Sequence, residues 1–130
     1  MQSCAPRPAP GRVLVIEDDP EAALFAVYAL EKGGQFKVTH TADPAVALAL
    51  AVTESWDLAV TDLDLPVISG ARLIAALRAV APRLPVILVT AHRFEPMPPA
   101  GCQPDDMLLK PFSAASLLAA AVAVCPSRGS

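Results

Sequence analysis

Three carboxylates stand directly after short apolar segments of the sequence. Glu17 and Asp18 follow Val13–Ile16, and Asp62 follows Leu58–Thr61. Each apolar segment has the length and composition of a buried β-strand. Carboxylates that gather at neighbouring strand ends repel one another, so a folded protein tolerates them only with a compensating charge. Oxygen ligands of this kind suit Mg²⁺, which combines few carboxylates with water and phosphate oxygens.

Two further polar residues stand at the ends of the next apolar segments. Thr90 ends Val86–Thr90, and Lys110 follows Met107–Leu109. Lysine is a flexible point charge that suits a phosphoryl group, and the threonine hydroxyl adds a donor. A metal ion, a lysine, a hydroxyl and a central carboxylate are what phosphoryl transfer needs. The sequence therefore predicts a phosphoryl-transfer site in which Asp62 is the nucleophile and becomes an aspartyl phosphate.

The segments between these strands have the pattern of helices. Besides a strand at Phe36–Thr41, we expect helices from Pro20 to about Lys32, Pro44 to about Glu54, Ser69-Gly70 to Pro82, and Ala114 to about Val124. Strands that are apolar throughout are buried on both faces, which favours a doubly wound α/β fold with a parallel sheet. Five strands favour the flavodoxin-like order 2-1-3-4-5. Ligands bind such a sheet at the carboxyl ends of its strands, where the site residues are expected to meet.

The segment between the fourth and fifth predicted strands does not continue this alternation. It contains four prolines between residues 96 and 104. Proline interrupts helices, because it lacks a backbone N–H and its ring clashes with the preceding turn. We therefore expect the fourth helix to be shortened or replaced by an irregular loop over Ala91–Asp105.

Composition and charge exclude several classes of protein. The chain has 130 residues, of which 54% are hydrophobic, and its thirteen acidic and ten basic residues leave a net charge of −3. The length fits one domain, and the acidic balance excludes the basic surface that direct nucleic-acid binding needs. No apolar run could span a bilayer, and the prolines of Met1–Gly11 exclude a signal peptide. A cytoplasmic protein with no membrane partner is expected.

The cysteine and histidine residues show no pattern of a metal or disulfide site. Cys4, Cys102 and Cys125 are odd in number and far apart, so neither a disulfide framework nor a zinc site is expected. His40 and His92 stand alone and are predicted to be surface or loop residues. The expected metal site therefore consists of carboxylates.

Several stretches of the sequence together resemble the receiver domain of two-component response regulators. They are Val13–Asp19, Thr61–Pro66 followed by Ser69-Gly70, Val89–Ala91 and Leu109–Phe112. The resemblance covers about residues 12–125, and its motifs occur in the order that the family shows. Residues 1–11 are then expected to be a proline-rich tail or linker, and residues 126–130 a C-terminal tail.

The resemblance implies a role for each carboxylate. Asp62 would accept a phosphoryl group from the phosphohistidine of a histidine kinase or a histidine phosphotransfer protein. Asp18 and Glu17 would hold Mg²⁺ together with Asp62 and the backbone carbonyl of Asp64. The domain would be a signalling phosphoacceptor and not an enzyme, apart from autophosphorylation and slow self-dephosphorylation.

The resemblance also assigns the residues around the phosphoryl group. Thr90 would bond a phosphoryl oxygen after transfer, and Lys110 would pair with that group before a cis peptide bond to Pro111. The small side chain of Ala91 would leave the phosphoryl group accessible. Most receivers have Tyr or Phe three residues before the lysine as the partner of the threonine switch. Met107 stands there in this sequence, and the flexible methionine is the expected substitute.

The sequence departs from the family pattern in two further respects. The loop Ala91–Asp105 stands in place of a helix, and we expect phosphorylation to order or shift it. The last predicted helix, Ala114–Cys125, carries no charge, although a surface helix normally has a polar side. Its exposed residues are either merely small, or they contact a second copy or an adjoining domain.

Kinase specificity is expected along the first helix, around Ala22, Ala23, Phe25 and Ala26.

Three alternatives stay open at this stage. Because only six residues follow Val124, the chain is expected to be either a free-standing receiver or one excised from a larger protein such as a hybrid histidine kinase. A phosphatase of the haloacid dehalogenase type would also use an Asp-Leu-Asp sequence, but Pro66 stands where that motif has Thr or Val. A pseudo-receiver that only binds partners is disfavoured by the intact set of site residues.

Overall fold

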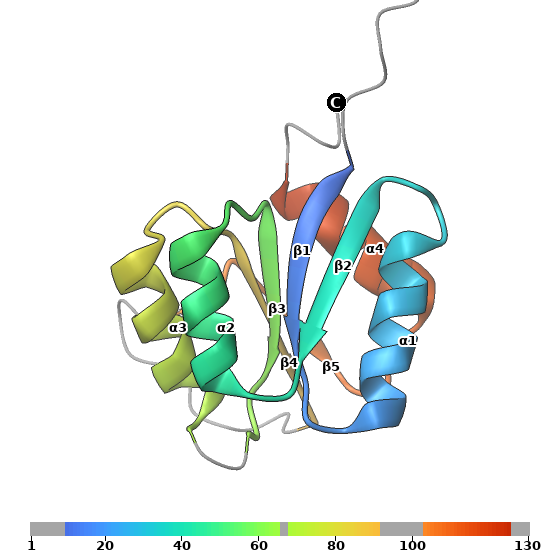
Figure 1. Cartoon of the computed structure of the whole chain (residues 1–130). Coiled ribbons are helices and arrows are strands. Elements are labelled where there is room, and N and C mark those ends of the chain that lie inside the picture. Colours follow the sequence, from blue (N-terminus) through green and yellow to red (C-terminus); the bar gives the residue numbers. More distant parts are fainter. Residues whose placement is uncertain (1–9, 66–67, 92–102, 126–130) are drawn as a thin grey trace, which may run out of the picture.

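The computed structural model describes residues 10–65, 68–91 and 103–125, which form one parallel sheet covered by helices on both faces (Figure 1). The strands are β1 Gly11–Ile16, β2 Phe36–Thr41, β3 Leu58–Asp62, β4 Val86–Thr90 and β5 Asp106–Leu109, and the helices are α1 Pro20–Glu31, α2 Pro44–Thr53, α3 Gly70–Val80 and α4 Ala114–Val124. The strand order is β2-β1-β3-β4-β5 with all neighbours parallel. The predicted fold class and strand order are confirmed.

Each face of the sheet has its own hydrophobic core. Val13 and Val15 of β1 pack with residues of α1 and α4, while Leu14 and Ile16 pack with residues of α2 and α3. Successive side chains of a strand point to opposite faces, so a strand covered on both sides buries every position. All five residues of β3 and of β4 are buried for this reason.

Polar caps fix where the helices begin, at the carboxyl ends of the strands. Asp19 and Asp43 accept hydrogen bonds from the backbone N–H groups two residues further on, and a proline follows each of them. Ser69 and Ser113 cap α3 and α4 in the same way, three residues ahead. These caps set how each loop leaves the sheet, and the loop after β1 carries two of the predicted site residues.

Two strands begin earlier than the apolar pattern predicts. β1 begins at Gly11, whose N–H donates to the carbonyl of Gln35 at 2.8 Å, and Gly11 pairs with Phe36. β5 begins at Asp106, which pairs with Ile87. Backbone pairing places both residues in strands, and the apolar pattern does not detect them because neither has an apolar side chain.

No helix lies between β4 and β5 in the described part of the chain, in agreement with a shortened or missing fourth helix. Residues 92–102, which make up most of the predicted loop, lie outside the described residues. The start of β5 is anchored to its neighbours. Arg78 donates to the carbonyl of Gln103 at 2.8 Å and to the Asp105 carboxylate at 3.1 Å, and that carboxylate also accepts from the Val86 N–H at 2.8 Å.

The last helix buries one side and exposes small residues on the other. Leu117, Ala120 and Ala121 of α4 are buried. Cys125 follows the helix, is also buried and donates its thiol to the carbonyl of Asp57 at 3.3 Å. Cys4 and Cys102 lie outside the described residues. Among the helices that the structure describes, none has the length and hydropathy to cross a membrane.

Candidate functional site

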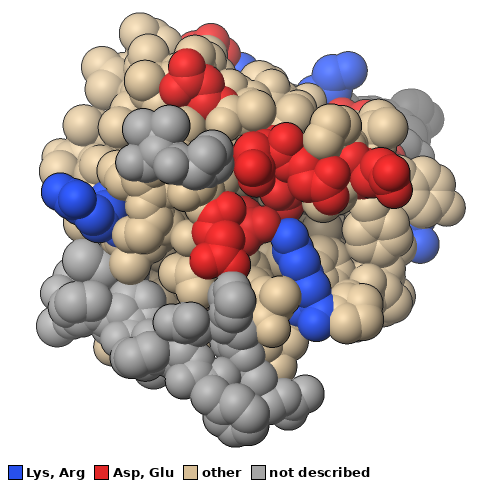
Figure 2. All heavy atoms as spheres, turned by 90° about the horizontal axis from the view of Figure 1, so that it is seen from below, with Lys and Arg blue, Asp and Glu red and all other residues tan. Residues whose placement is uncertain are grey.

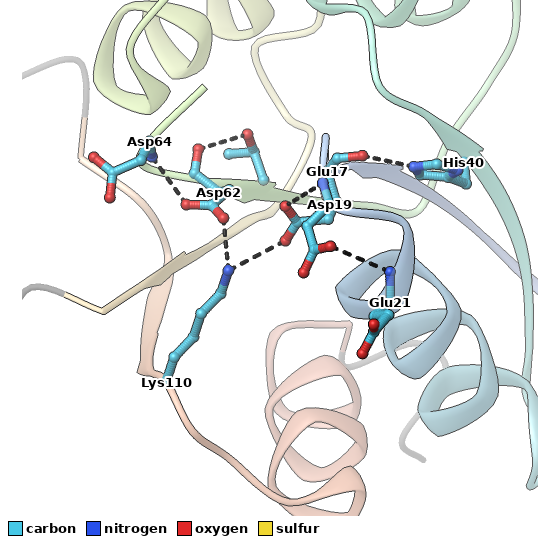
Figure 3. Close-up of polar contacts among 8 residues, drawn as sticks. Glu17, Asp19, Glu21, His40, Asp62, Asp64 and Lys110 are labelled. Carbon is cyan, nitrogen blue, oxygen red and sulfur yellow. Dashed lines mark hydrogen bonds and ion pairs between the residues drawn. The ribbon is translucent and has the colours of Figure 1, made fainter. Parts of the chain in front are cut away.

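Side chains from three strand ends meet at the carboxyl edge of the sheet (Figure 3). Asp62 is the last residue of β3, Glu17 follows β1 and Lys110 follows β5. The Lys110 ammonium lies 2.7 Å from Oδ2 of Asp62 and 3.3 Å from Oε1 of Glu17. Figure 2 views this end of the molecule and shows acidic side chains gathered beside a basic one. One cation therefore bridges two carboxylates.

Asp18 brings a third carboxylate to the same place. One carboxylate oxygen from each of Glu17, Asp18 and Asp62 lies within 4.8 Å of the others. Asp18 is exposed, whereas the side chains of Glu17 and Asp62 are only 8% exposed. Three negative charges face one lysine, so the cluster retains an uncompensated negative charge. The all-oxygen donor set and this charge fit a hard divalent cation such as Mg²⁺.

The crowding changes the acidity of the groups in the cluster. Burial raises the pKa of Glu17, and the nearby Asp62 carboxylate raises it further, against the lowering by the hydrogen bond from the Asp19 N–H. Burial lowers the pKa of Lys110, but the hydrogen bond and the charge of Asp62, together with Glu17, outweigh it and hold that pKa above its usual value. Lys110 therefore holds its proton firmly and carries a positive charge beside the two carboxylates.

Asp62 is held from two sides. Its Oδ2 accepts from Lys110, and its Oδ1 accepts from the backbone N–H of Asp64 at 2.9 Å. The first residue of α3 packs against the backbone next to it. A Cβ atom at Gly70 would lie 2.6 Å from the Asp62 carbonyl oxygen and 2.7 Å from Cα of Leu63. Only glycine lets the helix approach so closely, which explains its position in the sequence.

Thr90 and Met107 occupy neighbouring strands beside this cluster. Thr90 ends β4, is buried, and its carbonyl accepts from the Lys110 N–H at 2.8 Å. Leu88 pairs with Met107, and both belong to the core that faces α2 and α3. Because side chains alternate along a strand, Thr90 points to the same face as Leu88. The two predicted switch residues therefore share one face of the sheet.

A cleft of about 590 Å³ opens beside Asp62 and Lys110. Its walls come from α1 and from the segment after β5, and its floor is the apolar core. The lining includes Ala22, Phe25, Ala26, Phe112 and Leu117. The rings of Phe25 and Phe112 lie 5.8 Å apart between centroids, in a tilted arrangement. Three of the four residues expected to set kinase specificity line this cleft. The fourth, Ala23, is buried and does not line it.

A comparison with known families assigns this architecture. The sequence profile of the response regulator receiver domain matches residues 13–122. This chain belongs to the response regulator receiver family. The resemblance inferred from the motifs is thereby confirmed, and the family takes precedence over the phosphatase alternative.

Two curated relatives of the receiver differ in the share of their own length that the match covers. It is 36% identical over 121 residues to the transcriptional regulatory protein PrrA of Mycobacterium tuberculosis, covering 92% of this chain and 52% of PrrA. It is 33% identical over 103 residues to the response regulator receiver protein CpdR of Brucella abortus, covering 78% of this chain and 85% of CpdR. The chain thus spans about half the length of the first curated relatives it matches.

A solved structure with similar geometry comes from a sensor kinase. The receiver domain of sensor histidine kinase PA1611 from Pseudomonas aeruginosa PAO1 superposes with a TM-score of 0.81 at 28% identity, covering 94% of this chain and 100% of that domain. That structure has a magnesium ion coordinated in its active site cleft.

The structure also reports on the smaller predictions. Asp19 caps α1 through a 3.4 Å contact from the Glu21 N–H. The Lys110-Pro111 peptide bond is cis, as the resemblance implies. Asp64 contributes its N–H to Asp62, and its side chain is exposed. Ala91 is exposed and lines the cleft.

Sequence reasoning missed one residue of the site's surroundings. The predicted surface position of His40 is confirmed, because His40 is exposed on β2, but its contact with the acidic cluster was not predicted. Its Nε2 atom is 2.7 Å from the backbone carbonyl oxygen of Glu17. The signal that could have found it is its position next to the end of β2, the strand that pairs with β1.

Proposed function

We propose that this receiver accepts a phosphoryl group from a protein phosphohistidine onto Asp62, with Mg²⁺ bound beside it, and signals by protein contact. The observation that carries the proposal is the Asp62 carboxylate itself. It is buried, 2.7 Å from Lys110, and shares a 4.8 Å cluster with Glu17 and Asp18. Such an arrangement positions a nucleophile between a fixed cation and a metal site.

The transfer is a displacement at phosphorus. A carboxylate oxygen of Asp62 forms the new P–O bond while the P–N bond to the donor histidine breaks, and the bond's electron pair leaves on the imidazole nitrogen. Glu17, Asp18 and Asp62, with the Asp64 carbonyl, would hold the Mg²⁺, which when bound neutralises the phosphoryl oxygens. Lys110 supplies the second cation and pairs with a phosphoryl oxygen after transfer.

The signal would pass from Asp62 to the neighbouring strands. Thr90 ends β4 and would bond a phosphoryl oxygen through its hydroxyl. Met107 shares the sheet face of Thr90 and packs against Leu88, and its flexible side chain can repack when the threonine moves. The proposed consequence is a change in the segment between β4 and β5, residues 91–105.

The phosphodonor would be a histidine kinase or a histidine phosphotransfer protein. Its histidine must reach Asp62, so the donor also covers the adjoining cleft and α1. Most residues that line the cleft are apolar, and Leu24 and Tyr28 on the outer face of α1 are exposed. Because the kinase domain that donates the phosphoryl group is expected in the cytoplasm, we propose that the receiver is cytoplasmic too. The receiver domain would comprise residues 12–125, and it would not bind nucleic acid directly.

A second candidate is a receiver that belongs to a larger protein such as a hybrid histidine kinase. The similarity to the PA1611 receiver favours it, because that domain is part of a sensor histidine kinase. The charge-free helix α4 would then contact an adjoining domain, whereas in a free-standing receiver it would contact a second copy. Sedimentation of the chain at several concentrations distinguishes the two, because only the free-standing receiver is expected to form a dimer through α4.

Acetyl phosphate tests the proposal without a cognate kinase. The chain is incubated with acetyl phosphate and Mg²⁺, and its intact mass is measured. We expect the mass to increase by one phosphoryl group, and the increase to disappear in Asp62→Asn and in the presence of EDTA. A pseudo-receiver would show no increase under any of these conditions, and that result would contradict the proposal.

A further inference from the structure

His40 contacts the backbone carbonyl of Glu17 rather than the carboxylates of the site (Figure 3). Its Nε2 atom lies 2.7 Å from the carbonyl oxygen of Glu17. A carbonyl oxygen only accepts hydrogen bonds, so the imidazole carries its hydrogen on Nε2 and donates it. His40 therefore binds the loop between β1 and α1 as a donor.

β2 holds both backbone groups of Glu17. The Glu17 N–H donates to the carbonyl of Thr41 at 3.1 Å, which extends the pairing of β1 and β2 by one residue. The Glu17 carbonyl accepts from His40, which the strand register places opposite Val15. The N–H lies in the peptide between Ile16 and Glu17, whereas the carbonyl lies in the peptide between Glu17 and Asp18. The hydrogen bond from His40 is therefore the contact through which β2 orients the peptide between Glu17 and Asp18.

The loop is also fixed on its far side. Asp19 caps α1 through the Glu21 N–H, and its own N–H donates to Oε2 of Glu17 at 3.2 Å. Asp18 is the one residue between these two anchors. Its carboxylate is drawn into a cluster with two others, where like charges repel. Backbone anchors on both sides oppose the displacement that this repulsion favours.

From these contacts we infer that His40 is a positioning residue for the Mg²⁺ site. Its Nε2–H donor fixes the peptide that aims Glu17 and Asp18 at the same ion as Asp62. His40 is not a ligand, because the metal-capable group found among the described residues consists of the three carboxylates alone. The inference rests on the proposed function, since it adds a residue to the proposed metal requirement.

Calorimetric titration of the full chain with Mg²⁺ tests this inference. His40→Leu removes the donor and keeps an apolar side chain of similar size, and we expect the Kd for Mg²⁺ to rise about threefold to tenfold, as for one lost neutral hydrogen bond. His40→Gln keeps an N–H donor at the end of its side chain and is expected to stay within about twofold of wild type. Gln35→Leu, an exposed position just before β2, is the matched control and should leave the Kd unchanged.

Two results would overturn the inference. One is a His40→Leu variant with the wild-type Kd, and the other is an equal loss of affinity in His40→Leu and His40→Gln, which would indicate the ring's packing rather than its donor. Thermal unfolding in EDTA verifies that each variant folds, and His40→Ser replaces His40→Leu should the latter not fold. A wild-type chain that binds no Mg²⁺ would instead contradict the proposed function, and this inference with it.

Discussion

The two ends of the sheet carry charged clusters that differ in net charge: the cluster at the amino end is balanced, and the cluster at the carboxyl end is negative. At the amino end, Arg12 forms an ion pair with Glu54, donates to the Ser55 carbonyl at 3.0 Å and lies over the ring of Trp56, 4.3 Å from its centroid. The side chains of Arg12 and Glu54 are 43% and 41% exposed. One positive and one negative charge meet in water, where such a pair contributes little to stability.

At the carboxyl end, three carboxylates gather beside one lysine, which pairs with Glu17 and Asp62, and these two carboxylates are almost completely buried. Burying unbalanced charge costs folding free energy, because desolvation is not offset by pairing. A site that retains this cost is suited to a ligand that supplies the missing positive charge. The comparison therefore distinguishes an ion pair that supports the fold from a cluster that binds a cation.

Removal of the lysine should have the largest effect on chemistry. Lys110→Met eliminates the fixed cation beside Asp62, and we expect phosphorylation by acetyl phosphate to slow by about 10²–10³-fold, as for a lost oxyanion donor. The matched control is Arg12→Met at the opposite end of the sheet, which should keep the wild-type rate. The rates are measured from intact mass against time, and equal rates in both variants would contradict a role for Lys110.

The charge imbalance predicts that Mg²⁺ stabilises the fold. A ligand that binds only the native state at one hundred times its Kd raises the free energy of unfolding by about 2.7 kcal/mol. Asp18→Asn should abolish most of this gain, because it removes one ligand and one negative charge. Glu54→Gln removes a carboxylate at the other end and should keep the whole gain. Urea unfolding with and without Mg²⁺ measures both, and an undiminished gain in Asp18→Asn would count against the site.

The surroundings of Gly70 and Gly33 show that packing is tighter at the carboxyl end of the sheet than at the amino end. A Cβ atom at Gly70 would lie 2.6 Å from the Asp62 carbonyl oxygen, whereas the nearest atom to a Cβ at Gly33 is 3.9 Å away. We expect Gly70→Ala to lower the free energy of unfolding by about 1–3 kcal/mol through overpacking. Gly33→Ala should change it by less than about 0.5 kcal/mol. Urea unfolding decides, and similar values for both would show that α3 shifts freely.

A small effect on stability is expected from the loss of the amino-end ion pair. Arg12→Met loses an exposed ion pair and a cation–π contact, and we expect the free energy of unfolding to fall by about 1 kcal/mol. Its phosphorylation rate and its Mg²⁺ affinity should equal those of wild type. A loss of several kcal/mol in urea unfolding would show that the two clusters differ less than the comparison holds.

The sequence predicted what depends on local patterns and on strand order. Uniformly apolar runs identified β3 and β4, because a strand buried on both faces leaves no other pattern. In a parallel sheet the carboxyl ends of β1, β3 and β5 lie at the same edge, so Glu17, Asp62 and Lys110 could be assigned to one site from the sequence alone. Their convergence is a consequence of topology.

Features that depend on contacts between distant segments could not be predicted from the sequence. His40 is a lone polar residue on an exposed strand position, and only the β1–β2 register brings it to Glu17. The cleft beside Asp62 arises because small residues of α1 face the apolar core and the segment after β5. No local pattern encodes how two side chains from distant segments fill, or fail to fill, the space between them.

The central claim is that Asp62 is the phosphoacceptor. After incubation with acetyl phosphate and Mg²⁺, reduction with borohydride converts an aspartyl phosphate to homoserine, which tandem mass spectrometry locates in the sequence. We predict homoserine at position 62 and at no other aspartate. Homoserine at another position, or none in a chain that binds Mg²⁺, would contradict the account.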